Sequence, residues 1–213
     1  MYGLKQAPRS WYGRINSFLT SLGFTKHNSD PHLYFKVMDD EHVILLLYVD
    51  EFFLTSNEKQ ILECKKKLTA EFKMKNLGLM HCFLGLEVWH SLGGIFLIQG
   101  KYAMEIMKMF DMLECKSMAT TMDTHLKLLD DASSELVDVT LYRQIIGSLM
   151  YLTNTHPNIC IVVNPLSQYM VEPRHVHLVV AKHVMRYQKG TIDYGLSYTR
   201  YHDFKLYGYT NSY

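Results

Sequence analysis

The segment from Val43 to Thr55, VILLLYVDEFFLT, limits the possible folds more than any other part of the sequence. It places two adjacent carboxylates, Asp50 and Glu51, between two runs of apolar residues. Such apolar runs predict buried β-strands, and the carboxylates then occupy a tight turn between them. We therefore expect Val43 to Thr55 to form a β-hairpin that presents Asp50 at its turn.

Two like charges at one turn repel each other unless a cation lies near them. Mg²⁺ prefers oxygen ligands, and two such ions about 4 Å apart stabilise the entering and leaving oxygens in phosphoryl transfer. The alternative is a solvated turn, where Asp and Glu are common. The pair alone leaves a metal site and a solvated turn open.

Periodicity and capping residues predict the other elements. Thr55 and Glu58 fit a capping box at the start of a helix at 55–72, and Gly23 fits the C-terminal cap of the first helix. Pro165 predicts a kink in a helix at 157–170. Polar, turn-rich residues at 116–138 predict a linker. Helices are expected at 8–24, 55–72, 101–113, 140–154, 157–170 and 172–190, and strands at 32–37, 42–49, 52–56, 80–90, 94–99, 194–199 and 204–210.

Composition is that of a globular protein, with 213 residues of which 48% are hydrophobic and 20% charged. The formal net charge of +1 means that any basic surface must be local. The four cysteines form no CxxC pair, which favours reduced thiols in a reducing compartment. No stretch approaches the roughly 18 apolar residues of a membrane span, and the N-terminus lacks the form of a signal peptide.

Three groups of residues have a structural interpretation beside a functional one. Trp11 and Tyr12 are expected in the core more than in base stacking. The run Lys65 to Lys67 is expected on a solvated helix face, with contact to a nucleic-acid duplex as the alternative. The histidines at 175, 177 and 183 are interpreted as surface or hydrogen-bonded side chains, and a metal site is the alternative.

Motifs in one order point to a family. The box YVDE resembles the Tyr-Val-Asp-Asp box of reverse transcriptases, and YGLKQAPRSWY is similar to a second polymerase motif of copia-type retrotransposons. The family's order and spacing also fit SDPHLYFK, EFKMKNLGLMHCFLGLEV, LYRQIIGSLMYLTNTHPNI, LSQYM, AKHVMRYQKGT and YGYTNS. The chain is identified as a member of the copia-type long-terminal-repeat retrotransposon polyproteins, in the reverse transcriptase region that runs into ribonuclease H.

The resemblance implies roles for individual residues. Asp50 would be a ligand of the catalytic Mg²⁺ ions, and Glu51 stands where the family has a second Asp. The other implied positions are nucleotide- and template-binding Tyr2, Gly3, Lys5 and Gln6, primer-gripping Phe83, Leu84 and Gly85, and Asn211 in place of the first catalytic Asp of ribonuclease H.

The resemblance also implies an α+β fold with an antiparallel palm sheet. The expected domains are the palm remainder and thumb at 1–115, the linker at 116–138, a helical connection region at 139–200 and a ribonuclease H stub at 201–213. The family's partners are an RNA template, a DNA primer and deoxynucleotides, with no membrane.

Template-directed nucleotidyl transfer is the activity of the intact family. Its further catalytic Asp and its fingers precede the YGLKQAP motif, so we expect this chain to be inactive alone. The alternative is a non-catalytic module, such as a domesticated gene product, that binds nucleic acid or protein. The sequence leaves open the oligomeric state and whether the protein lies in the cytoplasm or the nucleus.

Overall fold

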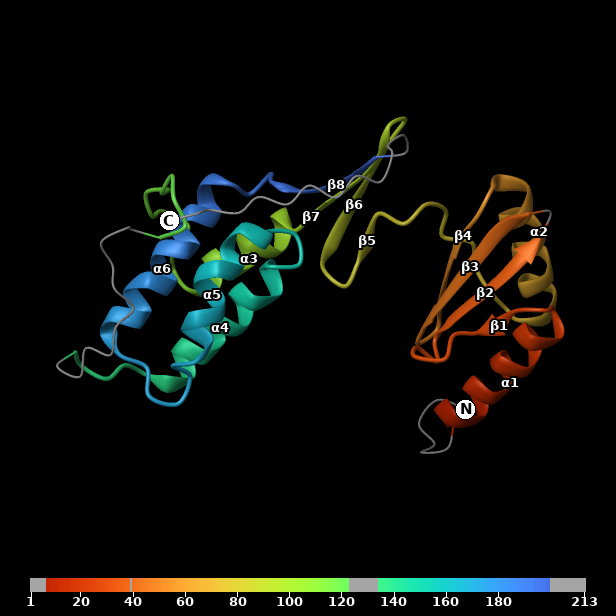
Figure 1. Ribbon diagram of the computed structural model, residues 1–213, viewed down its shortest axis with the longest axis horizontal. Coiled ribbons are helices and arrows are strands. Elements are labelled where there is room, and N and C mark those ends of the chain that lie inside the picture. The colour runs from red at the N-terminus through yellow and green to blue at the C-terminus, as the bar shows by residue number, and fades with distance from the viewer. Residues whose placement is uncertain (1–6, 39, 123–133, 200–213) are drawn as a thin grey trace, which may run out of the picture. The chain divides into compact units, whose positions relative to one another are not determined.

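The computed structural model describes residues 7–38, 40–122 and 134–199 (Figure 1). The chain divides into two compact units, Met1–Gly78 and Leu79–Tyr213, and each has its own hydrophobic core. Helices and two antiparallel sheets confirm the α+β class. The division falls inside the segment expected as palm and thumb, and the assignment of palm, thumb, connection and ribonuclease H remains a prediction.

The first unit is an antiparallel sheet with two helices against one face (Figure 1). Burial alternates along its third strand: Val43, Leu45 and Leu47 are buried among helix residues, and the side chains between them point the other way. The elements are α1 (Ala7–Ser21), β1 (Thr25–Lys26), β2 (Leu33–Met38), β3 (Glu41–Tyr48), β4 (Glu51–Thr55) and α2 (Glu58–Glu71), with the strands in the order β1-β2-β3-β4.

The ends of the two helices follow from local chemistry. Gly23 has a φ of 84°, which confirms the expected left-handed cap after α1. The predicted capping box at Thr55 is wrong, because Thr55 pairs with Ile44 as the last residue of β4. Asn57 caps α2 instead, and its side chain accepts a hydrogen bond from the backbone N–H of Gln60 at 3.0 Å.

Aromatic side chains of α1 belong to the core of the first unit. The ring of Trp11 lies edge-on against Phe72, with 5.4 Å between the ring centroids. Tyr12 packs against the same core and donates a hydrogen bond from its hydroxyl to the carbonyl of Pro31 at 2.7 Å. These contacts confirm the structural interpretation of both residues.

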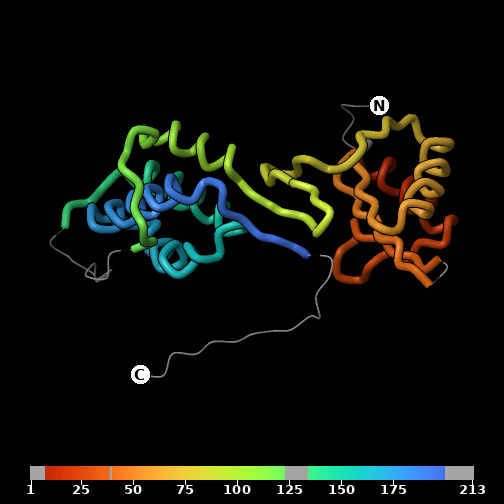
Figure 2. Tube along the Cα trace, turned by 90° about the horizontal axis from the view of Figure 1, so that it is seen from above, coloured from red at the N-terminus to blue at the C-terminus, as the bar shows by residue number. Residues whose placement is uncertain are grey.

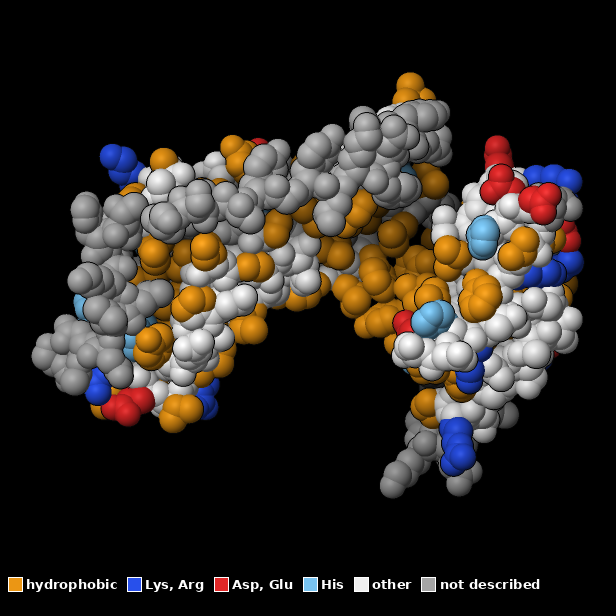
Figure 3. Space-filling view, viewed as in Figure 1, with side chains coloured by type: hydrophobic (Ala, Val, Ile, Leu, Met, Phe, Trp, Pro, Cys, Tyr) orange, Lys and Arg blue, Asp and Glu red, His pale blue; other side chains and the backbone are white. Residues whose placement is uncertain are grey.

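The face of this sheet that α1 and α2 leave uncovered carries exposed apolar side chains. Phe35 of β2 is exposed and pairs with exposed Ile44 of β3, and Val37 and Tyr48 are exposed elsewhere on the same two strands. Hydrophobic side chains can be seen among those at the surface of this unit in Figure 3.

The second unit joins a four-stranded antiparallel sheet to a group of helices. The sheet order is β5-β6-β7-β8, and β8 runs beside β7 although the helices separate them in sequence (Figure 2). The elements are β5 (Cys82–Phe83), β6 (Leu86–Ser91), β7 (Gly94–Ile98), α3 (Gly100–Met109), α4 (Val139–Leu152), the 3₁₀ helix η1 (Pro157–Ile159), α5 (Cys160–Ser167), α6 (His175–Gly190) and β8 (Gly195–Thr199).

Several expectations for this unit change in detail. The strand expected at 80–90 is interrupted at Leu84 and Gly85, so that β5 and β6 pair with each other. The helix expected at 157–170 begins as η1 and ends at Ser167, two residues after Pro165. The strand at 194–199 is confirmed as β8, and the strand expected at 204–210 lies outside the described residues.

The described part of the expected linker contacts α6. The backbone N–H of Met118 donates to the carbonyl of Arg186 at 3.1 Å, and Nε2 of His183 lies 3.0 Å from the carbonyl of Thr120. In the part of the chain that the structure describes, no helix has the length and apolar character needed to cross a membrane.

Candidate functional site

The two carboxylates lie at the end of the β3–β4 hairpin. Tyr48 pairs directly with Glu51, so Val49 and Asp50 are the two residues of the turn. Asp50 is exposed at the tip, and Glu51 is the exposed first residue of β4. The expected hairpin from Val43 to Thr55 is confirmed.

Sequence reasoning missed the backbone strain of this turn. Val49 has a φ of 53°, in the left-handed region that β-branched residues rarely adopt. Two-residue hairpin turns usually place Gly, Asn or Asp at such positions. The only signal in the sequence is the absence of those residues at position 49, immediately before the first carboxylate.

The directions of the side chains follow from strand alternation. Phe52 packs against the core below the sheet, so Glu51 lies on the opposite, uncovered face beside its cross-strand partner Tyr48. Adjacent carboxylates on exposed backbone suit a hydrated Mg²⁺, which takes one or two protein carboxylates together with substrate phosphates. Among the described residues, no group of three or more His, Cys, Asp or Glu could hold a metal ion. The two carboxylates of Asp50 and Glu51 are of the chemical type that such an ion takes as ligands.

The other residues with implied roles are distributed along the chain. Phe83, Leu84 and Gly85 lie in the second unit, where they form the end of β5 and the turn into β6. Those near the termini lie outside the described residues: Tyr2, Gly3, Lys5, Gln6 and Asn211.

The turn between β5 and β6 has its own constraint. Leu84 and Gly85 have φ values of 50° and 75°, as a type I′ turn requires at both central positions. The hydroxyl of Tyr151, on α4, donates a hydrogen bond to the carbonyl of Leu84. A Cβ atom added to Gly85 would lie 3.5 Å from the ring and the hydroxyl of Tyr151. Sequence reasoning gave Tyr151 no role.

The interpretations of the lysines and histidines can also be compared with the structure. Lys67 pairs with Glu63 at 2.6 Å on the exposed face of α2, which agrees with a solvated helix face. His177 is buried, and its Nδ1 accepts a hydrogen bond from the backbone N–H of Arg174 at 3.1 Å. With the contact of His183 described above, this confirms that both histidines are hydrogen-bonded.

A buried cluster of polar side chains connects three segments of the second unit through hydrogen bonds. His156 is buried, with Nδ1 2.9 Å from Oγ1 of Thr155 and Nε2 3.2 Å from the carbonyl of Thr191. Oγ1 of Thr155 lies 2.8 Å from the side-chain amide of buried Gln99. Burial lowers the pKa of His156 below its usual value, because desolvation disfavours the imidazolium. The cluster links residues before α3, after α4 and after α6.

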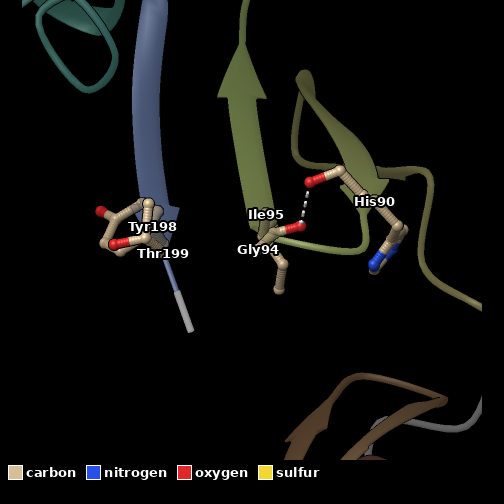
Figure 4. A pocket seen from close by; sticks show the side chains of 6 residues that line it. His90, Gly94, Ile95, Tyr198 and Thr199 are labelled. Carbon is tan, nitrogen blue, oxygen red and sulfur yellow. Dashed lines mark hydrogen bonds between the residues drawn. The ribbon is translucent and has the colours of Figure 1, made fainter. Parts of the chain in front are cut away.

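A shallow cavity of about 280 Å³ lies at the end of the second sheet, between Gly94 and Ile95 on β7 and Tyr198 and Thr199 on β8 (Figure 4). His90 is among the residues that line it, and Nε2 of its ring lies 2.7 Å from the carbonyl of Met80. The lining offers no cluster of acids or nucleophiles, so we assign it no chemistry.

Comparison with known proteins agrees with the order of motifs. A family model described as reverse transcriptase (RNA-dependent DNA polymerase) matches residues 1–124. The retrovirus-related Pol polyprotein from transposon RE2 of Arabidopsis thaliana is 36% identical over 213 residues, which cover 100% of this chain and 15% of that polyprotein. The corresponding polyprotein from transposon TNT 1-94 of Nicotiana tabacum is 34% identical over 206 residues, covering 90% and 15%.

A shorter relative gives the same result. A putative transposon Ty5-1 protein of Saccharomyces cerevisiae is 34% identical over 201 residues, covering 93% of this chain and 65% of its own length. No solved structure was found to match. The chain spans only 15% of the length of the two plant polyproteins. It belongs to the reverse transcriptase (RNA-dependent DNA polymerase) family, and its relatives are copia-type retrovirus-related polyproteins of transposons.

Proposed function

We propose that this chain contributes the carboxylate turn and a primer-contacting turn to a retrotransposon RNA-directed DNA polymerase. The observation that carries the proposal is the β3–β4 hairpin, which presents Asp50 and Glu51 together at an exposed turn. Membership of the reverse transcriptase family supplies the reaction class, template-directed nucleotidyl transfer. An RNA template, a DNA primer and deoxynucleotides are the substrates in this proposal.

Asp50 and Glu51 have different roles in the proposed site. Asp50 would hold Mg²⁺ directly, and Glu51 would hold it less well because its carboxylate is one methylene further from the backbone. When bound, Mg²⁺ would stabilise the charge that develops on the oxygens of the transferred phosphoryl group. Tyr48, paired with Glu51 at the base of the turn, would help to fix the direction of the carboxylates.

Other residues complete the proposal. The turn at Leu84 and Gly85 would contact the primer. Residues outside the described ranges would bind the nucleotide and template, namely Tyr2, Gly3, Lys5 and Gln6. Asn211, at the ribonuclease H position, is neutral where an anionic ligand is needed, so we propose no RNA cleavage by that domain.

The chain alone should not extend a primer. Nucleotidyl transfer with two metal ions needs carboxylates from separate strands, and much of its rate depends on how these groups position the ions. Two adjacent carboxylates on one exposed turn should bind Mg²⁺ only weakly without further ligands.

The test is a complemented primer-extension assay. The chain is mixed with a fragment of a related transposon polyprotein that covers the region before the match, a labelled DNA primer on an RNA template, Mg²⁺ and four deoxynucleotides. We expect extension from the mixture and none from either part. Asp50→Asn should reduce extension by at least about 100-fold, the scale for loss of one charge-stabilising group. Glu51→Asp should increase it.

Glu41→Gln is the matched control, because Glu41 is an exposed carboxylate at the other end of β3. It should leave extension unchanged. Equal extension by Asp50→Asn and the unmodified chain would refute the role of Asp50. Tight binding of primer–template without extension by any mixture would instead support the alternative, a non-catalytic binding module.

A further inference from the structure

The turn at Leu84 and Gly85 is held in a conformation that its sequence does not favour. Both residues have positive φ, which glycine adopts readily and leucine does not. The pairing of Phe83 with Leu86 closes this turn, but β5 contains only two residues. So short a strand gives the turn little support from the sheet.

Tyr151 supplies support from another element. Its hydroxyl donates a hydrogen bond to the carbonyl of Leu84, and its ring lies at van der Waals distance from the position of a Cβ on Gly85. Tyr151 itself lies in the last turn of α4, and Leu149 and Leu152 on either side of it are fully buried. The hydroxyl is therefore attached to a rigid support.

A second aromatic ring restricts Tyr151 further. Tyr102 on α3 packs edge-on against it, with ring centroids 5.0 Å apart and an angle of 82° between the planes. This contact fixes the direction of the phenol ring, and with it the direction of the hydroxyl toward Leu84. The side chain of Leu84 remains 51% exposed. The backbone of the turn is thus fixed while its apolar side chain stays available to a ligand.

We propose that Tyr151 is a positioning residue for the primer-contacting turn of this chain. It acts through the carbonyl of Leu84 and does not itself touch the primer. This inference rests on the proposed function, in which the turn meets the primer. Loss of the hydroxyl would release the backbone at Leu84 and Gly85 without removing any group that the primer contacts.

The experiment compares Tyr151→Phe with Tyr102→Phe in the full chain. Both variants remove one hydroxyl from the same aromatic pair, but only the first removes the hydrogen bond to the turn. Three quantities are measured: the carbonyl ¹³C chemical shift of Leu84, the amide exchange rates of Gly85 and Leu86, and the dissociation constant of an RNA–DNA primer–template duplex. Thermal unfolding confirms that each variant is folded.

For Tyr151→Phe we expect a changed carbonyl shift at Leu84 and amide exchange about fivefold faster, the effect of losing one hydrogen bond of ordinary strength. Duplex binding should weaken by a similar factor, and Tyr102→Phe should resemble the unmodified chain. A merely structural role would instead change the midpoint of unfolding without selective changes at the turn.

Unchanged carbonyl and exchange signals in Tyr151→Phe would overturn the proposal. A changed carbonyl shift or exchange rate at the turn with an unchanged dissociation constant for the duplex would overturn it as well. In that case Tyr151 would fix the turn, but the turn would not affect primer binding. If the unmodified chain binds no duplex by itself, the dissociation constants are measured in the mixture with the complementing fragment. If that mixture binds no duplex either, the proposed function fails, and the carbonyl and exchange signals alone decide whether Tyr151 fixes the turn.

Discussion

Replacing Val49 with glycine should stabilise the first unit, Met1–Gly78, by about 1 kcal/mol. A β-branched residue with a φ of 53° is strained, and such strain costs about 1–3 kcal/mol. Glycine removes this strain, but it adds about 0.5–1 kcal/mol of conformational entropy to the unfolded chain. The Val49 side chain is 70% exposed, so its removal sacrifices little burial. The strain that glycine relieves is larger than the entropy cost, so glycine should raise the free energy of unfolding.

Fluorescence can follow the first unit separately. The chain has two tryptophans, Trp11 in the core of the first unit and Trp89 in the second unit. In a Trp89→Phe background, the emission of Trp11 reports the unfolding of the first unit alone. A stabilisation of 1 kcal/mol raises the midpoint of thermal unfolding by about 4–8 °C in a domain of this size.

Val37→Gly is the matched control for this prediction. Val37 is an exposed valine within β2, paired with His42, and its backbone is not in the left-handed region. Glycine there should lower stability by about 0.5–1 kcal/mol. If Val49→Gly lowers the midpoint as Val37→Gly does, the turn is not strained and the reasoning is wrong.

Two further predictions concern the second unit. Burial lowers the pKa of His156 below its ordinary value of 6.5, so the contribution of the neutral ring to stability is complete above pH 6.5. The free energy of unfolding should then decline as the pH falls toward the folded-state pKa, by at most about 1.4 kcal/mol per pH unit. Urea unfolding of the chain and of His156→Gln at pH 5 and 7 tests this, and an equal loss of unfolding free energy in both proteins between these two pH values would contradict it. Gly195→Ala should destabilise the unit by about 1–3 kcal/mol, because the added Cβ would lie 2.1 Å from the carbonyl of Leu97. A Cβ added at Gly147, on the exposed side of α4, would have no atom within 4 Å. Gly147→Ala should therefore stabilise the unit by about 0.5–1 kcal/mol, and thermal unfolding compares the two variants.

The hairpin with the carboxylates could be predicted because its signals are local. Two apolar runs of strand length flank Asp50 and Glu51, so the two acids are expected at the turn between the strands. The structure pairs β3 with β4 on either side of that turn. The start of α2 was misplaced for a local reason as well. Thr55, Ser56 and Asn57 are all good capping residues. The register of β4 excludes Thr55, and the hydrogen bond from the backbone N–H of Gln60 to the side chain of Asn57 identifies Asn57 as the cap.

Contacts between distant segments could not be predicted from the sequence. The hydroxyl of Tyr151 and the carbonyl of Leu84 lie 67 positions apart, and nothing in either segment identifies the other. In the same way, β8 was expected as a strand, but its pairing of Gly195 with Ile98 on β7 depends on how the helices between them fold. Periodicity identifies elements, whereas the partners of those elements depend on the tertiary structure.

Strained backbone gives a second argument for the two proposed turns. Four non-glycine residues among those described have positive φ: Asp40, Val49, Leu84 and Asp111. Aspartate tolerates this conformation because its short polar side chain can bond to nearby backbone, but valine and leucine gain no such compensation. Val49 and Leu84 lie in the two turns for which we propose metal and primer contacts. A glycine would satisfy either backbone at lower cost, so these side chains are not explained by stability. Strain of this kind is typical of functional sites. It therefore supports a functional role for both turns on grounds that do not depend on resemblance to the family.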